Sequence, residues 1–242
     1  MSDVRADLRR VWRRSARYRP RTATGWIAVV TVAAYIVQLL TAPVLENALL
    51  YAAVYSLPST GAPFEPWRML TSALIHQPIA IPGSIIGLTH IAFNMIALVS
   101  FGRPLEHVIG APRLVAIYLI GALGGSVGVL YAAFFGLIGV NTGVYGASGA
   151  VFAVLGAVAV VQRRLGIDVR MLVVLIAVNL ALGFVVSGIA WQAHVGGLVV
   201  GAATGWLFVA NRGPRRDARA RIGAVGITTV LLALALVPAA VV

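Results

Sequence analysis

The sequence contains no cysteine and no lysine, and only 11% of its 242 residues are charged. Without cysteine, a disulfide framework, a thiol nucleophile and a thiolate metal site are all excluded. A chain with so few charges and 60% hydrophobic residues could not stay dispersed in water as a soluble domain. The composition therefore predicts an integral membrane protein.

Seven charge-poor runs approach the roughly 20 apolar residues that a helix needs to cross a bilayer. Polar residues do not recur at every second position within them, as they would in the strands of a membrane barrel. The runs therefore predict helices, and the expected fold class is all-α, a polytopic helical membrane bundle. The predicted spans are residues 26–45, 88–106, 114–138, 147–161, 171–186, 191–209 and 222–242.

All 19 basic residues are arginine, and they are unevenly distributed along the chain. If the N-terminus is cytoplasmic, every arginine except Arg68 falls on the cytoplasmic face, as the positive-inside rule requires. The net charge of +12 would suggest nucleic acid in a soluble chain, but here topology and attraction to anionic lipid explain it. We expect a multi-pass cell-membrane protein, with membrane lipid and no nucleic acid among its partners.

Three polar side chains fall at one depth in three different predicted helices. Ser148, His90 and His194 lie 15, 13 and 18 residues before the next arginine of the cytoplasmic face. At about 1.5 Å of rise per residue, these separations correspond to roughly 22, 20 and 27 Å. In a hydrocarbon core of about 30 Å, all three share a layer in the outer half, where polar groups tend to pair or do chemistry.

Ser148 and His194 together suit a nucleophile and its general base. Taken alone, Ser148 is most simply a packing residue, because small residues surround it. His194, however, precedes a GxxxGxxxG stripe that would let its helix approach another closely. A serine and a histidine on separate, closely packed helices are what a catalytic dyad requires. The small residues singled out on the two helices are Gly146, Gly149, Gly197 and Gly201.

Donors for the oxyanion of such a reaction also occur at this depth. His90 and Asn94 are spaced i, i+4 and so lie on one face of a helix. The backbone N–H of Ser148 adds a third donor, because amides in the first turn of a helix have no partner within it. No acidic residue lies at a depth where it could orient His194, so the sequence predicts a dyad rather than a triad.

These residues stand in short motifs that together resemble the rhomboid intramembrane serine proteases. The motifs are WR at 67–68, HIAFN at 90–94, GRPLE at 102–106, GASG at 146–149 and AHVGG at 193–197. The resemblance implies a six-helix core with Ser148 as nucleophile and His194 as base. It places His90 and Asn94 at the oxyanion hole. It also implies transmembrane protein substrates cut in or near their spans, no cofactor or metal, and an active site that opens to the outer side.

On this basis the chain divides into three parts. Residues 1–24 form an arginine-rich cytoplasmic segment, residues 25–210 the six-helix protease core, and residues 211–242 a basic linker followed by a seventh membrane helix. A long loop on the outer side, residues 46–87, is expected to insert partly beside the active site. By the same analogy, the helix at 171–186 helps form the gate through which substrates enter.

Four further motif residues and one loop histidine have expected structural roles. Phe152 stands one helical turn after the serine, where relatives often carry tyrosine, and its ring is expected to stack on the predicted base. Trp67 and Arg68 belong to a loop signature of the family, or are simply an interfacial aromatic and a snorkelling cation. Glu106 is either a structural hydrogen-bonding anchor or an interfacial carboxylate. His76 either lies near the cavity or is a solvated loop residue, and the solvated position is the expected one.

Two other function classes remain open. A transporter or channel would line a polar path with the same histidines and with Asn179, but almost no ionisable residue sits mid-membrane and no inverted repeat is evident. A catalytically silent relative would bind transmembrane clients without cutting them, but such proteins lack part of the dyad, and this chain has both members. Zinc and aspartyl chemistries are excluded by the lack of an HExxH motif and of paired aspartates in the spans.

Overall fold

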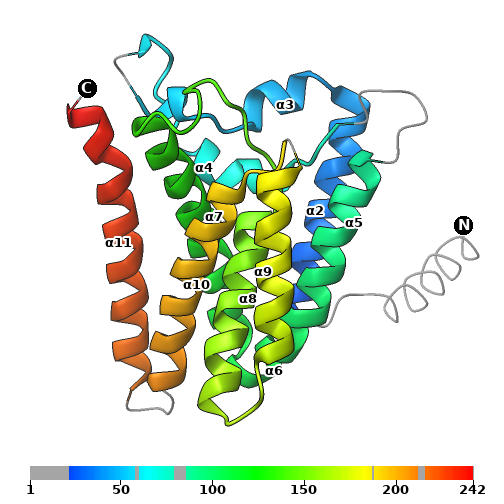
Figure 1. Ribbon diagram of the computed structural model, residues 1–242, viewed down its shortest axis with the longest axis vertical. Helices are drawn as coiled ribbons and strands as arrows, with labels where there is room; N and C mark the ends of the chain where they lie inside the picture. The colour runs from blue at the N-terminus through cyan, green and yellow to red at the C-terminus, as the bar shows by residue number, and fades with distance from the viewer. Residues whose placement is uncertain (1–21, 58–59, 79–85, 187, 212–215, 242) are drawn as a thin grey trace, which may run out of the picture.

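The computed structural model describes residues 22–57, 60–78, 86–186, 188–211 and 216–241, so most of the arginine-rich segment lies outside the described residues. Within these ranges the chain is a helical bundle with no β-strand, which confirms the predicted fold class (Figure 1). The main helices are α2 (Ala23–Thr41), α5 (Ile86–Ala97), α6 (Arg103–Ile109), α7 (Ala111–Phe134), α8 (Ser148–Arg164), α9 (Arg170–Val185), α10 (Trp191–Ala210) and α11 (Asp217–Val241).

In the described residues, each predicted span corresponds to one helix or to a joined pair. Helices α2, α7, α10 and α11 are long and apolar enough to cross a membrane, and α9 is a shorter apolar helix. The second span is α5 and α6 joined by a π-helical turn, Leu98–Gly102. The first span ends at Thr41, short of the predicted residue 45, because Pro43 lacks the N–H that would continue the helical hydrogen bonds.

The long loop contains short helices rather than extended chain. They are α3 (Val44–Leu49), α4 (Arg68–Thr71) and two 3₁₀ turns, Ala53–Ser56 and Ser72–Leu74. An isolated antiparallel bridge between Tyr51 and Val144 joins this loop to the segment that precedes α8. The loop is therefore attached to the bundle close to the start of α8.

Helices α7 and α8 form the interior of the bundle. All side chains of α8 from position 149 to 158 are buried. The surrounding helices α2, α9 and α11 instead expose large apolar side chains, such as Leu40, Met171 and Ile222. An outer surface that is apolar around a core of small residues is the arrangement expected of helices that face lipid.

Helices α8 and α10 pack with their backbones in contact along the predicted glycine stripe. A Cβ on Gly197 would overlap the carbonyl oxygen of Gly149, and a Cβ on Gly201 would overlap the backbone of Ala153. A larger residue at either stripe position would push the two helices apart. The spacing of the glycines therefore sets the distance between α8 and α10.

Glu106 of α6 closes the N-terminus of α2. Its carboxylate accepts hydrogen bonds from the N–H groups of Ala23 and Thr24 at 2.8 and 2.9 Å, and from the Thr24 hydroxyl at 2.6 Å. These amides have no partner within the helix, and a negative charge is favourable at the positive end of the helix dipole. Of the two expectations for Glu106, these contacts support the structural anchor.

Helix α11 is fastened to α7 near both of its ends. At one end, Nη2 of Arg113 lies 2.8 Å from Oδ1 of Asp217. At the other, the Tyr131 hydroxyl donates to the carbonyl oxygen of Leu234 at 3.2 Å. Figure 1 shows α11 along one edge of the bundle, with α2 and α5 at the opposite edge.

Candidate active site

Ser148 is the first residue of α8, and the turn before it depends on Gly146. Gly146 has a φ of +113°, in the region that favours glycine, and a Cβ there would lie 2.8 Å from Cε1 of His90. Ala147 follows with helical backbone angles and caps α8. Ser148 is partly exposed, whereas Ala147 and Gly149 on either side are buried. Ser148 is therefore the partly exposed residue between two buried ones at the start of α8.

His194 of α10 meets the same end of α8. Its side chain is buried, and its ring stacks on Phe152 with a centroid distance of 4.2 Å and an interplanar angle of 7°. This is the stack expected from the sequence. Because Phe152 follows Ser148 by four residues, both lie on the face of α8 that His194 contacts.

The hydrogen bond of a catalytic dyad is not formed in this structure. Within the described ranges, no hydrogen bond joins the Ser148 hydroxyl to His194, and Nδ1 of His194 has no hydrogen-bond partner. The structure thus brings the two residues to one helix contact and leaves the bond between them unmade. Catalytic hydrogen bonds are often long or poorly aligned until substrate is present.

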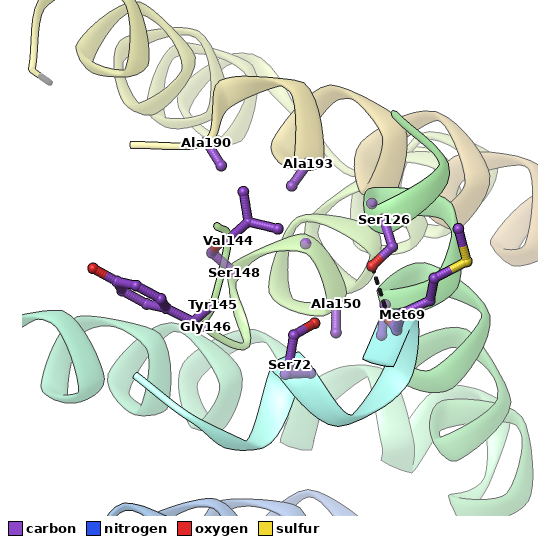
Figure 2. A pocket seen from close by; sticks show the side chains of 14 residues that line it. Met69, Ser72, Ser126, Val144, Tyr145, Gly146, Ser148, Ala150, Ala190 and Ala193 are labelled. Atoms are coloured by element: carbon purple, nitrogen blue, oxygen red, sulfur yellow. Dashed lines mark hydrogen bonds between the residues drawn. The ribbon is translucent and has the colours of Figure 1, made fainter. Parts of the chain in front are cut away.

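A small cavity opens beside Ser148 (Figure 2). It has a volume of about 30 Å³, enough for one or two water molecules. Its lining is mostly alanine, glycine and serine. These residues come from the 3₁₀ turn Ser72–Leu74, from α7, from the turn before α8 and the first residues of α8, and from the start of α10; Met69, Val144 and Tyr145 complete it. Figure 2 shows the Ser126 hydroxyl bonded to the carbonyl oxygen of Met69, at 2.7 Å. The cavity therefore gives a water-sized space next to Ser148.

His90 of α5 directs one ring nitrogen at the turn before α8. Its Nδ1 accepts a hydrogen bond from the N–H of Gln77 at 3.3 Å, so the neutral ring carries its proton on Nε2. Cε1 and Nε2 are the ring atoms nearest Gly146. His90 thus presents an N–H donor beside the turn. Asn94 is buried, and its amide N–H donates to the carbonyl oxygen of His90 at 2.9 Å, within its own helix.

His76 is buried beside this site, so the expectation of a solvated loop residue is wrong. Its Nε2 accepts the N–H of Ala147 at 3.4 Å, and its ring packs against those of His90 and Tyr35 at centroid distances of 5.2 and 6.1 Å. The apolar residues just before it, 73–75, were the available signal of burial. In the part of the chain that the structure describes, no group of three or more potential metal ligands occurs.

Arg68 organises the long loop and is not a snorkelling cation. Only 7% of its surface is exposed, while the neighbouring Trp67 is 54% exposed. The partners of its guanidinium group are the Glu65 carboxylate, the carbonyl oxygens of Asn47 and Leu50, and the face of the Tyr55 ring. Arg68 therefore ties α3 and the first 3₁₀ turn to the beginning of α4.

Comparison with known proteins assigns the same region to one family. Residues 63–211 match the Rhomboid domain. The chain is 33% identical to the rhomboid protease GluP of Bacillus subtilis over 139 residues, which cover 57% of this chain and 25% of GluP. It is 33% identical to RHOMBOID-like protein 4 of Arabidopsis thaliana over 148 residues, covering 60% of this chain and 34% of that protein.

A third relative is matched over most of its length. The chain is 28% identical to the rhomboid protease AarA of Providencia stuartii over 223 residues, covering 78% of this chain and 75% of AarA. The chain thus spans about a quarter to a third of the first two relatives and three quarters of the third. The region matched by the domain contains α4, α7, α8 and α10, all of which contribute residues to the lining of the cavity.

Proposed function

Because the chain belongs to the rhomboid family, we propose that it is an intramembrane serine endopeptidase that hydrolyses peptide bonds in or near the transmembrane segments of membrane proteins. Two of its relatives are named proteases, and its apolar helices make it a multi-pass membrane protein. The observation that carries the proposal is the Phe152–His194 stack on the helix that begins with Ser148. It puts a histidine ring one helical turn from Ser148, which lines the cavity.

In the proposed reaction, Ser148 is the nucleophile and His194 the general base. His194 takes the hydroxyl proton as Oγ forms a bond to the peptide carbonyl carbon. The C–N bond then breaks as the imidazolium returns that proton to the leaving amine. Water hydrolyses the acyl-enzyme by the same two steps. The flat stack on Phe152 holds the imidazole plane, so it takes the orienting role that a carboxylate has in a triad.

Three donors are proposed for the oxyanion. The Nε2–H of His90 and the backbone N–H of Ser148 border the turn, and the side-chain amide of Asn94 is the third. Each donor of this kind contributes about 2.7–4 kcal/mol to the transition state in soluble precedents. For Asn94 to take part, its amide must leave the carbonyl oxygen of His90 that it binds in this structure.

The proposed topology places the N-terminus in the cytoplasm and opens the site to the other side of the membrane. The arginine distribution supports this orientation, since Arg68 alone would face outward. The long loop would cover the site, and α9 would flank the entry path of the substrate. The partners of this protein are then transmembrane substrates and the surrounding lipid.

The test is cleavage of a tagged transmembrane reporter by purified protein in detergent. S148A and H194A should each lower the rate of cleavage by at least about a thousandfold, because the serine and the histidine of a dyad act together and neither works without the other. Ser100→Ala and His107→Ala change exposed residues of the same types and should keep the wild-type rate. Equal cleavage by S148A and wild type would remove Ser148 from the mechanism.

The second candidate is a relative that binds transmembrane clients without cutting them. It predicts that wild-type protein retains the reporter intact and that S148A behaves identically. A transporter finds less support, because Asn179 is exposed on α9 and donates to the carbonyl oxygen of Leu175 in its own helix at 2.8 Å.

A further inference from the structure

A segment of the long loop, residues 72–77, is hydrogen-bonded to the turn that precedes α8. The carbonyl oxygen of Ser72 accepts the N–H of Gly146 at 3.0 Å. Next along the turn, the N–H of Ala147 donates to Nε2 of His76 at 3.4 Å. The last two amides before the proposed nucleophile are therefore both bonded to this segment.

The segment is itself held by two side chains of α2. The Gln38 amide donates to the carbonyl oxygen of His76 at 2.6 Å and accepts its N–H at 2.9 Å. One turn earlier, the Tyr35 hydroxyl donates to the carbonyl oxygen of Gln77 at 3.3 Å. Gln38 is fully buried, and an unpaired amide is costly in such a place, so its position and that of His76 are strongly coupled.

The hydrogen bond to Ala147 also fixes the proton of His76. Because an N–H donor faces Nε2, that nitrogen must carry the lone pair, and Nδ1 must carry the hydrogen. The ring of His90 lies against that of His76 and has the opposite tautomer. Its Nδ1 accepts the N–H of Gln77, so its proton is on Nε2. One histidine thus accepts a hydrogen bond at the serine turn, and the other presents an N–H to it.

We propose that His76 is a positioning residue for Ser148 and that Gln38 holds it in place. The inference rests on the proposed protease function. His76 acts through Ala147: its hydrogen bond sets the direction in which α8 begins, so that the Ser148 hydroxyl reaches the cavity. Since the N–H groups of Gly146 and Ala147 are already bonded, the next amide along the chain, that of Ser148, is left for the oxyanion.

The test separates the shape of the His76 ring from its hydrogen-bond acceptor. His76→Phe keeps a ring and removes the acceptor, whereas His76→Gln places a carbonyl oxygen near the position of Nε2. We expect kcat on the reporter to fall about tenfold or more in H76F with KM within about twofold, because a misoriented nucleophile slows the chemistry rather than binding. H76Q should return kcat to within about threefold of wild type.

Matched controls use the same residue types elsewhere. His107→Phe changes an exposed histidine and should leave kcat unchanged. Gln38→Met breaks the clamp on α2 without altering the ring and should lower kcat about threefold to tenfold, while Gln162→Met near the far end of α8 should not. The proposal is overturned if kcat falls equally in H76F and H76Q. It is also overturned if the variants lower the thermal midpoint of unfolding and leave kcat unchanged. If H76F does not fold, the comparison of kcat between Q38M and Q162M tests the proposal instead, and equal kcat in these two variants overturns it.

Labelling of the serine by a fluorophosphonate distinguishes this inference from the proposed function. If wild-type protein neither cleaves the reporter nor is labelled at Ser148, the protease function fails and the positioning role falls with it. If wild type is active and labelled, and H76F is labelled at the same rate, the protease function stands and only the role of His76 is wrong. Slower labelling of H76F, restored in H76Q, supports the proposal.

Discussion

Ser148 lies between two regions that are built in opposite ways. On the side of α10, backbones and small side chains touch directly, and glycines allow the close approach. On the side of segment 72–77 and α2, buried polar groups are joined by hydrogen bonds, as at Gln38 and His76. Close packing fixes how near two helices are, whereas hydrogen bonds fix the direction of the groups that they join. A reactive hydroxyl needs both, and each side of the site supplies one.

Between the two sides of the site, the largest effect should come from breaking the packed side at Gly197. A leucine there would be driven into the backbone of Gly149 and would separate His194 from the start of α8. Cleavage of the reporter should fall by at least about a hundredfold while the protein still inserts into membranes. Gly226→Leu adds the same side chain to α11, where no atom lies within 4 Å of the added Cβ, and is the control. Unchanged turnover of G197L would show that the close approach is dispensable.

Acid should lower the stability of the protein through the hydrogen-bonded side, at His76. Burial, with a smaller contribution from nearby His90, lowers the pKa of His76 from 6.5 to about 3. The unfolded chain therefore takes up the proton first, so the contribution of neutral His76 to stability is complete above pH 6.5 and is lost as the pH falls towards 3. Between pH 6.5 and about pH 5 the loss is at most about 2 kcal/mol.

This pH dependence can be measured as the thermal midpoint in detergent at neutral and acidic pH. Because glutamine does not titrate, the difference between the two midpoints should shrink in His76→Gln. It should persist in His107→Gln, which removes an exposed histidine instead. An identical pH dependence in wild type and H76Q would mean that His76 is not the group that acid protonates.

A smaller effect should separate ring stacking from simple packing on the side of α10. Phe152→Leu removes the stack on His194, which is worth about 0.5–1.5 kcal/mol, and kcat should fall about threefold to tenfold. Phe152→Tyr keeps the ring and should stay within about twofold of wild type. Phe93→Leu, at an exposed position of α5, is the control. If kcat falls as much in F152Y as in F152L, the ring face of residue 152 does not orient His194.

The smallest effect should come from one hydroxyl on the hydrogen-bonded side. Tyr35→Phe removes the bond to the carbonyl oxygen of Gln77 but keeps the ring that packs against His76. At 3.3 Å this bond is long, so the loss of unfolding free energy should be only about 0.5 kcal/mol. Thermal unfolding checks the value, and a destabilisation as large as that of Gln38→Met would mean that the hydroxyl holds the segment as strongly as the amide does.

The packed side could be predicted from the sequence because its information is local. The apolar runs, the glycine stripe and the four-residue spacing of Ser148 and Phe152 all follow from the period of a single helix. The structure adds the register between α8 and α10, which decides that Gly197 meets Gly149. The dyad hydrogen bond and the role of Asn94 stay predictions.

The hydrogen-bonded side could not be predicted in this way. Gln38 and His76 are 38 residues apart in the chain, and His76 and Ala147 are 71 apart. A buried histidine in a loop and a glutamine in an apolar helix have no periodic signature, because their burial depends on which distant segments meet them. The sequence left Arg68 open between a loop signature and a snorkelling cation for the same reason, since two of its acceptors are main-chain carbonyl groups that no pattern marks.

The two fastenings of α11 make the perimeter of the bundle uneven. A molecule that diffuses in the plane of a bilayer meets this protein from any direction, but α11 covers one flank of α7 and is tied there at Asp217 and Leu234. A molecule that approaches on that flank contacts α11 and does not reach α7. Under the proposed protease function, transmembrane substrates therefore reach the interior from the part of the perimeter that α11 does not cover, and their capture rate in two dimensions depends on the width of that part.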